Sequence, residues 1–181
     1  MVVFDTSTIL LALDPSAKPP TDDKGELVTN CKERIEFLIE TLGKSRTTIL
    51  IPTPVLAEYL VGVGPNKQDY IDRLSKSRNF DWGSFDVIAA IELSMLIDPD
   101  LKGEKTLDRT ETKAKVKFDR QIIAIAKSRR ADRIYTDDGK LAGRARLNGI
   151  AAVMTWEIPL PPSEAQGNLD LPKPDNENVN N

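Results

Sequence analysis

Short apolar segments alternate with longer amphipathic segments along most of this 181-residue chain. The apolar segments have the length of buried strands, and the amphipathic segments repeat apolar residues every three or four positions, as helices do. Such alternation is typical of a parallel sheet that is covered by helices on both faces. We therefore expect an α/β protein, a three-layer α/β/α sandwich around a central, mostly parallel sheet.

The expected strands are short: Val2–Phe4, Thr48–Ile51, Asn79–Trp82, Arg133–Tyr135 and Ile150–Met154. Five helices are expected over Glu26–Leu42, Gln68–Ser77, Asp86–Leu96, Lys115–Arg130 and Lys140–Asn148. Two more are expected to begin at Thr6 or Ser7 and at Pro54. We expect Gly43 to end the helix Glu26–Leu42. Two apolar faces are expected to be buried: Val87, Ile88, Ile91 and Met95 on one helix, and Phe118, Ile122, Ile125 and Ala126 on another.

The end of the chain differs in composition from the rest. From Glu157 onward it is rich in Pro, Asn and Asp, and such segments cannot bury enough apolar surface to fold. We expect one domain over residues 1–156, a disordered tail over residues 157–181, and a charged loop over Pro99–Thr112.

Histidine is absent, and Cys31 is the only cysteine. These two facts exclude a Ser-His-Asp triad, a Cys-His pair, a zinc site built from histidine or several cysteines, and a disulfide within the chain. Any hydrolytic chemistry must then rest on carboxylates, with a metal ion as their partner. No apolar run is long enough to cross a membrane and the N-terminus lacks a signal-peptide pattern, so we expect a cytoplasmic protein without membrane contact.

Acidic residues follow several of the expected strands. Asp5 follows the first strand, Glu58 lies in the helix after the second, and Asp137 and Asp138 follow the fourth. Asp119 falls on the inward face of the helix that leads into that fourth strand. Because the carboxyl ends of parallel strands meet at one edge of a sheet, we expect these acids to converge there.

Each acid alone has a structural explanation. Asp5 would suit a turn or a helix N-cap, Glu58 and Asp119 would suit a first helical turn, and one of Asp137 and Asp138 would suit an Asx turn. Together they are harder to explain, because clustered carboxylates repel one another and need a positive partner. An all-oxygen donor set favours Mg²⁺ or Mn²⁺, and two such ions about 4 Å apart can clamp a phosphodiester.

Four short motifs carry a family resemblance: Val3-Phe4-Asp5-Thr6-Ser7, Pro54-Val55-Leu56-Ala57-Glu58, the segment Phe118–Ala126 with its Asp119, and Thr136-Asp137-Asp138. In their order and separation, from Met1 to about Trp156, the chain resembles the PIN-domain ribonucleases, in particular VapC-like toxins of type II toxin–antitoxin systems. The resemblance implies a PIN-like fold and an Mg²⁺- or Mn²⁺-dependent endoribonuclease. It also implies a homodimer and an antitoxin protein that blocks the site.

The resemblance assigns roles to individual residues. The implied catalytic and metal-binding acids are Asp5, Glu58, Asp119 and Asp138, with Asp137 as a further candidate ligand. Which of the last two binds the metal stays open. The supporting residues would be Thr6 or Ser7 beside Asp5, and Thr136 as a residue that orients a ligand.

The overall net charge of −3 conceals a basic region. Residues 102–146 contain fourteen Lys and Arg against seven Asp and Glu, which suits contact with a phosphate backbone. Lys115, Lys117 and Arg120, next to Asp119, are the expected RNA contacts, whereas the charges of 127–130 suit a solvated helix surface equally well.

Two other classes of function remain as alternatives. The first is a PIN-like scaffold that binds RNA or a partner protein without cleaving it. The second is an aspartyl-phosphate phosphotransferase, whose chemistry requires Asp-x-Asp after the first strand. Ser7 stands in the third position here, which argues against the second class.

Overall fold

Five parallel strands form a single sheet in the computed structural model, which describes residues 1–63, 67–77, 79–97 and 112–162. The strands are β1 (Val2–Phe4), β2 (Ile49–Pro52), β3 (Phe80–Gly83), β4 (Arg133–Tyr135) and β5 (Ala151–Val153). Their order across the sheet is β3-β2-β1-β4-β5, and every neighbouring pair is parallel. The expected α/β class with a parallel sheet is confirmed, with all five strands within about two residues of their predicted bounds.

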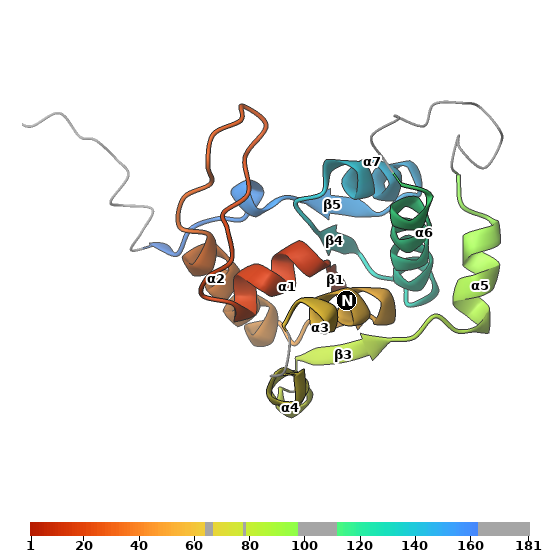
Figure 1. Cartoon of the computed structure of the whole chain (residues 1–181), viewed down its shortest axis with the longest axis horizontal. Coiled ribbons are helices and arrows are strands. Elements are labelled where there is room, and N and C mark those ends of the chain that lie inside the picture. The colour runs from red at the N-terminus through yellow and green to blue at the C-terminus, as the bar shows by residue number, and fades with distance from the viewer. Residues whose placement is uncertain (64–66, 78, 98–111, 163–181) are drawn as a thin grey trace, which may run out of the picture.

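Helices cover both faces of this sheet. They are α1 (Thr6–Leu13), α2 (Cys31–Lys44), α3 (Thr53–Gly62), α4 (Lys67–Lys76), α5 (Val87–Ser94), α6 (Lys113–Ser128), α7 (Gly139–Leu147) and the short 3₁₀ helix η3 (Thr155–Glu157). α1 packs on α2 on one side, while α6 packs on α5 and α7 on the other (Figure 1). None of the described helices is long and apolar enough to cross a membrane.

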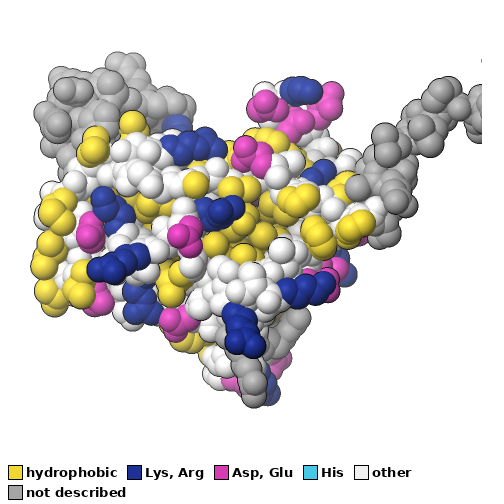
Figure 2. Space-filling model, turned by 180° about the vertical axis from the view of Figure 1, so that it is seen from behind, with side chains coloured by type: hydrophobic (Ala, Val, Ile, Leu, Met, Phe, Trp, Pro, Cys, Tyr) yellow, Lys and Arg dark blue, Asp and Glu magenta, His cyan; other side chains and the backbone are white. Residues whose placement is uncertain are grey.

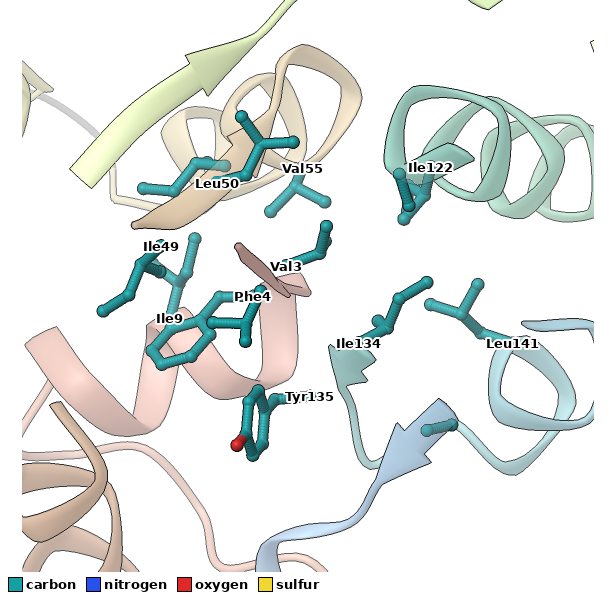
Figure 3. Close-up of a cluster of buried hydrophobic side chains, with 14 of the residues drawn as sticks. Val3, Phe4, Ile9, Ile49, Leu50, Val55, Ile122, Ile134, Tyr135 and Leu141 are labelled. Atoms are coloured by element: carbon teal, nitrogen blue, oxygen red, sulfur yellow. The ribbon is translucent and has the colours of Figure 1, made fainter. Parts of the chain in front are cut away.

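The core lies between the sheet and these helices. Val3, Leu50 and Ile134, from three adjacent strands, are fully buried and meet Val55 and Leu141 from the flanking helices (Figure 3). Burial of one such side chain stabilises the fold by about 1.5–3 kcal/mol. β1 and β2 are buried along their whole length, which explains why their sequences are continuous apolar runs and do not alternate.

The start and end of α2 differ from the prediction. α2 begins at Cys31 and not at Glu26, because the preceding residues pair with the Asp14–Gly25 loop: Thr21 forms a β-bridge with Leu27. Gly43 lies inside the helix, which continues to Lys44. A Cβ at Gly43 would lie 2.7 Å from Asn79 Nδ2, so this glycine provides room for the chain before β3.

The predicted burial of two helix faces is wrong. Val87, Ile88, Ile91 and Met95 on and just after α5 are 54–76% exposed, and α5 packs on α6 through the small, fully buried Ala89. Hydrophobic side chains accordingly gather along the edge of the molecule where α5 lies (Figure 2). On α6, Ile122, Ile125 and Ala126 are buried as expected, but Phe118 is 44% exposed.

Packing continues beyond the expected domain boundary at Trp156. Ile158 is 2% exposed, and its carbonyl accepts a hydrogen bond from the Arg34 guanidinium. The packed core therefore includes at least Ile158. Residues 163–181 of the expected tail, and residues 99–111 of the expected charged loop, lie outside the described part of the chain.

Candidate active site

A pocket of about 1180 Å³ opens at the carboxyl ends of β1 and β4. The chain runs from β1 outward to β2 and β3 and then returns to β4 on the other side of β1, so the strand order reverses between β1 and β4. Such a switch point is where open α/β sheets bind their ligands. The predicted acids all line this pocket: Asp5, Glu58, Asp119, Asp137 and Asp138. The structure therefore brings together the acids that the sequence predicted to converge.

Asp5 is a buried carboxyl whose position is not explained by helix capping. It occupies the N-cap position of α1, yet its side chain makes no capping hydrogen bond, and the residue is 7% exposed. Thr136 Oγ1 donates to Asp5 Oδ2 over 2.8 Å. Burial raises the pKa of Asp5 to about 6; hydrogen bonds from Thr136 and the Thr6 backbone oppose this shift, and the charges of Glu58 and Asp138 add to it. Asp5 is therefore buried in the pocket at a cost in solvation free energy.

Glu58 is the exposed acid of the pocket. It lies on α3, and Thr6 Oγ1 at the start of α1 donates to Glu58 Oε2 over 2.6 Å. The sequence predicted that Thr6 or Ser7 would support Asp5, but their side chains have other partners. Ser7 Oγ accepts the Asp137 backbone N–H over 3.0 Å. Asp5 is supported instead by Thr136, which fits the predicted role of that residue in orienting a ligand.

Asp119 forms a buried ion pair with Arg144. Arg144 Nη1 on α7 lies 2.6 Å from Asp119 Oδ2 on α6, and the two side chains are 13% and 6% exposed. The sequence placed Asp119 on the inward face but did not assign Arg144 to the site. The sequence carried only a weak signal, because Arg144 lies in the helix expected directly after Asp138 but is one of several basic residues in that region.

Asp138 is the N-cap of α7. Its Oδ1 accepts the backbone N–H groups of Lys140 and Leu141 over 2.8 and 3.2 Å, and its Oδ2 lies 2.5 Å from Lys115 Nζ. Burial alone would raise the pKa of Asp138, but Lys115 and these two backbone donors outweigh it and lower the pKa. The Asx-type role that the sequence suggested for one of the two aspartates therefore applies to Asp138, and it coexists with a place in the pocket.

Asp137 is bonded through both of its oxygens to Thr155. Asp137 Oδ1 accepts the Thr155 N–H over 2.8 Å, and Oδ2 accepts the Thr155 hydroxyl over 2.7 Å. These bonds connect the β4–α7 turn to η3, and burial raises the pKa of Asp137 despite them. The charge of Asp138 acts on Asp5, whereas both oxygens of Asp137 are engaged by Thr155, which favours Asp138 as the fourth acid of the cluster.

The walls of the pocket are partly apolar and partly basic. Leu10, Val61 and Phe118 line it, and nothing in the sequence pattern indicated that these three would share a surface. Of the three predicted RNA contacts, Lys115 lines the pocket, while Lys117 and Arg120 lie outside its lining. Lys117 is solvent-exposed on α6.

The donor chemistry of the pocket fits a hard divalent cation. The groups in it that could bind a metal ion with a negative charge are all carboxylates, whose oxygens Mg²⁺ and Mn²⁺ prefer. A bound cation would also relieve the repulsion that Glu58 and Asp138 exert on Asp5. With the side chains as they stand, the described residues contain no group of three acids close enough to hold an ion together. Asp119 and Asp138 are instead paired with Arg144 and Lys115.

Comparisons with known proteins give a structural match only. No protein-family model and no curated protein sequence matches the chain. A chain in the crystal structure of VapBC2 from Rickettsia felis, bound to a DNA fragment from their promoter, is similar to it with a TM-score of 0.55. The match covers 85% of this chain and 98% of that one at 18% sequence identity. At this identity the match establishes a shared fold, in agreement with the PIN-like fold expected from the sequence.

Proposed function

We propose that this protein is a metal-dependent endoribonuclease that cleaves RNA phosphodiester bonds in the acid pocket. The observation that carries the proposal is Asp5, a carboxyl buried at the switch point of the sheet, without a capping role, and subject to the charges of Glu58 and Asp138. A fold does not specify a function, so the argument rests on these groups and their positions.

The proposed ligands of an Mg²⁺ or Mn²⁺ ion are Asp5, Glu58, Asp119 and Asp138, with Asp137 as the alternative to Asp138. When bound, such an ion lowers the pKa of a water molecule and neutralises charge that develops on the phosphate. Thr136 orients Asp5, and Thr6 orients Glu58. Lys115, Lys117 and Arg120 of α6 are the proposed contacts to RNA phosphates, and Lys115, which lines the pocket, has the strongest support of the three.

The biological role that we propose is that of a VapC-like toxin with an antitoxin partner, acting in the cytoplasm. The similar structure is a VapBC2 complex, which agrees with the toxin–antitoxin resemblance of the sequence motifs. We further propose a homodimer. The outer face of α5 exposes four apolar side chains, Val87, Ile88, Ile91 and Met95, each by more than half, as expected of a surface that pairs with another protein surface.

One observation favours the second candidate, a non-catalytic PIN-like scaffold that binds RNA or a partner protein. Two of the acids are already paired with cations of this chain, and no three of the described acids stand close enough to share an ion. A pocket that never admits a metal would retain these ion pairs and bind its partner through its basic and apolar walls.

A cleavage assay separates the two candidates. Purified protein is incubated with a panel of single-stranded and structured RNAs in Mg²⁺, in Mn²⁺ and in EDTA, beside Asp5→Asn and the surface control Asp81→Asn, which lies outside the pocket. The nuclease proposal expects metal-dependent cleavage that Asp81→Asn retains and Asp5→Asn loses by at least about 100-fold. Cleavage that is unaffected by EDTA or by Asp5→Asn would overturn it. RNA binding without cleavage would favour the scaffold.

A further inference from the structure

Two of the pocket acids are held by basic side chains of the same chain, and one of these pairs is buried. We propose that Arg144 is a positioning residue that serves as the counter-ion of Asp119 in the metal-free protein and competes with the divalent cation for that carboxylate. This inference rests on the proposed function, because it assumes that the pocket binds a metal ion. It adds a residue that neither the sequence motifs nor the structural match assigns.

The two ion pairs have similar lengths but differ in their exposure to solvent. Arg144 Nη1 and Asp119 Oδ2 are 2.6 Å apart, with side chains 13% and 6% exposed. Lys115 Nζ and Asp138 Oδ2 are 2.5 Å apart, but their side chains are 48% and 22% exposed. Water therefore screens the lysine pair far more than the arginine pair, and Arg144 is the stronger competitor.

Competition follows from the chemistry of the shared carboxylate. Asp119 Oδ2 accepts a short, charge-assisted hydrogen bond from Arg144, and the same carboxylate would serve as a ligand to the cation. A divalent ion must displace this guanidinium or bind beside its positive charge, and both lower the apparent metal affinity. In return, Arg144 offsets the cost of burying the Asp119 carboxylate and holds it in place on α6, since a buried carboxylate without a positive partner is costly.

The test measures metal affinity and not cleavage. Mn²⁺ binding to the full chain is measured by calorimetry, with thermal unfolding in parallel, for the wild type, Arg144→Gln, Arg144→Lys, Asp119→Asn and the control Arg129→Gln. Arg129 forms an ion pair with Asp81 over 2.8 Å on the exposed surface, so it matches the chemistry without touching the pocket. A purely structural role for Arg144 predicts a loss of affinity on substitution, whereas competition predicts a gain.

The expected result is an Mn²⁺ dissociation constant at least about tenfold lower for Arg144→Gln than for the wild type, equivalent to about 1.4 kcal/mol. Arg129→Gln should match the wild type and Asp119→Asn should bind more weakly. Arg144→Gln should also unfold at a lower temperature without metal and gain more from Mn²⁺ than the wild type does. If Arg144→Gln does not fold, Arg144→Lys decides. Lysine lacks the fixed guanidinium fork, so this variant should hold Asp119 less firmly and also bind Mn²⁺ more tightly than the wild type.

Two results would overturn the inference, and they are distinguishable. In the first, the wild type binds Mn²⁺ and Asp119→Asn weakens this binding, but the Arg144 variants bind Mn²⁺ no more tightly than the wild type. This result would reject the inference and leave the proposed metal site intact. Absence of Mn²⁺ binding in every variant would reject the proposed metal site together with the inference.

Discussion

Asp5 and Asp119 in the acid pocket are 7% and 5% exposed, whereas Val87 and Ile91 on the outer face of α5 are 76% and 54% exposed. The pocket withdraws charged groups from water, and the α5 face leaves apolar groups in it. Both arrangements are unfavourable for an isolated chain, the first through lost solvation and the second through exposed apolar surface. Neither region is explained by stability alone.

The difference lies in how each cost is offset. In the pocket the chain supplies its own partners, with Thr136 bonded to Asp5 and Arg144 paired with Asp119. On α5, Ala89 is the one buried residue of the described helix and Leu93 is partly buried, whereas Val87, Ile88 and Ile91 are exposed. The pocket acids are bonded to groups of the same chain, and a small ligand could replace those partners. An uncovered apolar face, by contrast, is suited to contact with a second protein surface.

The largest effect is expected where a partner is removed from the buried pair. Asp119→Ala should lower the free energy of unfolding by about 3–5 kcal/mol, because it leaves the Arg144 charge in the interior without this carboxylate. Asp81→Ala, which breaks the exposed pair with Arg129, should cost less than about 1 kcal/mol. Urea denaturation of both variants measures the contrast, and equal losses would show that the pocket pair is as well solvated as the surface one.

A second prediction concerns pH. The pKa of Asp5 is raised from 3.8 to about 6 in the folded state. Between these two values the unfolded chain ionises Asp5 while the folded chain keeps its proton, so stability falls as pH rises and the loss is complete above about pH 6. The shift corresponds to about 3 kcal/mol at pH 7.

Asp5→Asn isolates this effect, since an amide does not titrate in this range. The unfolding free energy of Asp5→Asn minus that of the wild type should increase by about 3 kcal/mol from pH 4 to pH 7. Chemical denaturation in metal-free buffer across this range gives the difference directly. A difference that is constant with pH would mean that Asp5 is solvated and that the pocket does not hold it at a cost.

The inner face of α5 should be the sensitive side of that helix. Ala89 is fully buried against α6, so Ala89→Leu overfills the contact and should destabilise the protein by about 1–3 kcal/mol. Thermal unfolding provides the measurement. A neutral Ala89→Leu would indicate that α5 is loosely packed on α6, and its outer face would then be less defined than the structure implies.

The outer face should be nearly neutral for folding and decisive for association. Ile91→Asp is expected to change the free energy of unfolding of the monomer by less than about 0.5 kcal/mol, because Ile91 is 54% exposed. In sedimentation experiments the wild type should be a dimer and Ile91→Asp a monomer. A dimer that persists in Ile91→Asp would place the interface elsewhere.

The sequence predicted the sheet and the converging acids because both follow from local patterns and from parallel topology. Val2–Phe4 is a short apolar run with one plausible use, and the acids after β1 and β4 are brought to one edge by any parallel arrangement. Glu58 and Asp119, which the sequence also placed near that edge, line the same pocket.

Features that depend on which elements pack together were not predictable in the same way. Periodicity showed that α5 has an apolar face, but it does not show whether the same chain covers that face. The hydroxyl of Thr6 bonds to Glu58, 52 residues away, and not to the adjacent Asp5. Arg144 was one of many basic residues in its region until the packing of α7 on α6 placed it beside Asp119.

The anomalous diffraction of crystals grown or soaked with Mn²⁺ tests most directly whether the pocket acids bind a metal ion. We predict an anomalous peak in the pocket among Asp5, Glu58, Asp119 and Asp138, with Arg144 moved from Asp119 Oδ2. A pocket without a peak in saturating Mn²⁺, with Arg144 and Asp119 still paired, would contradict the claim that these acids are arranged to bind a metal ion.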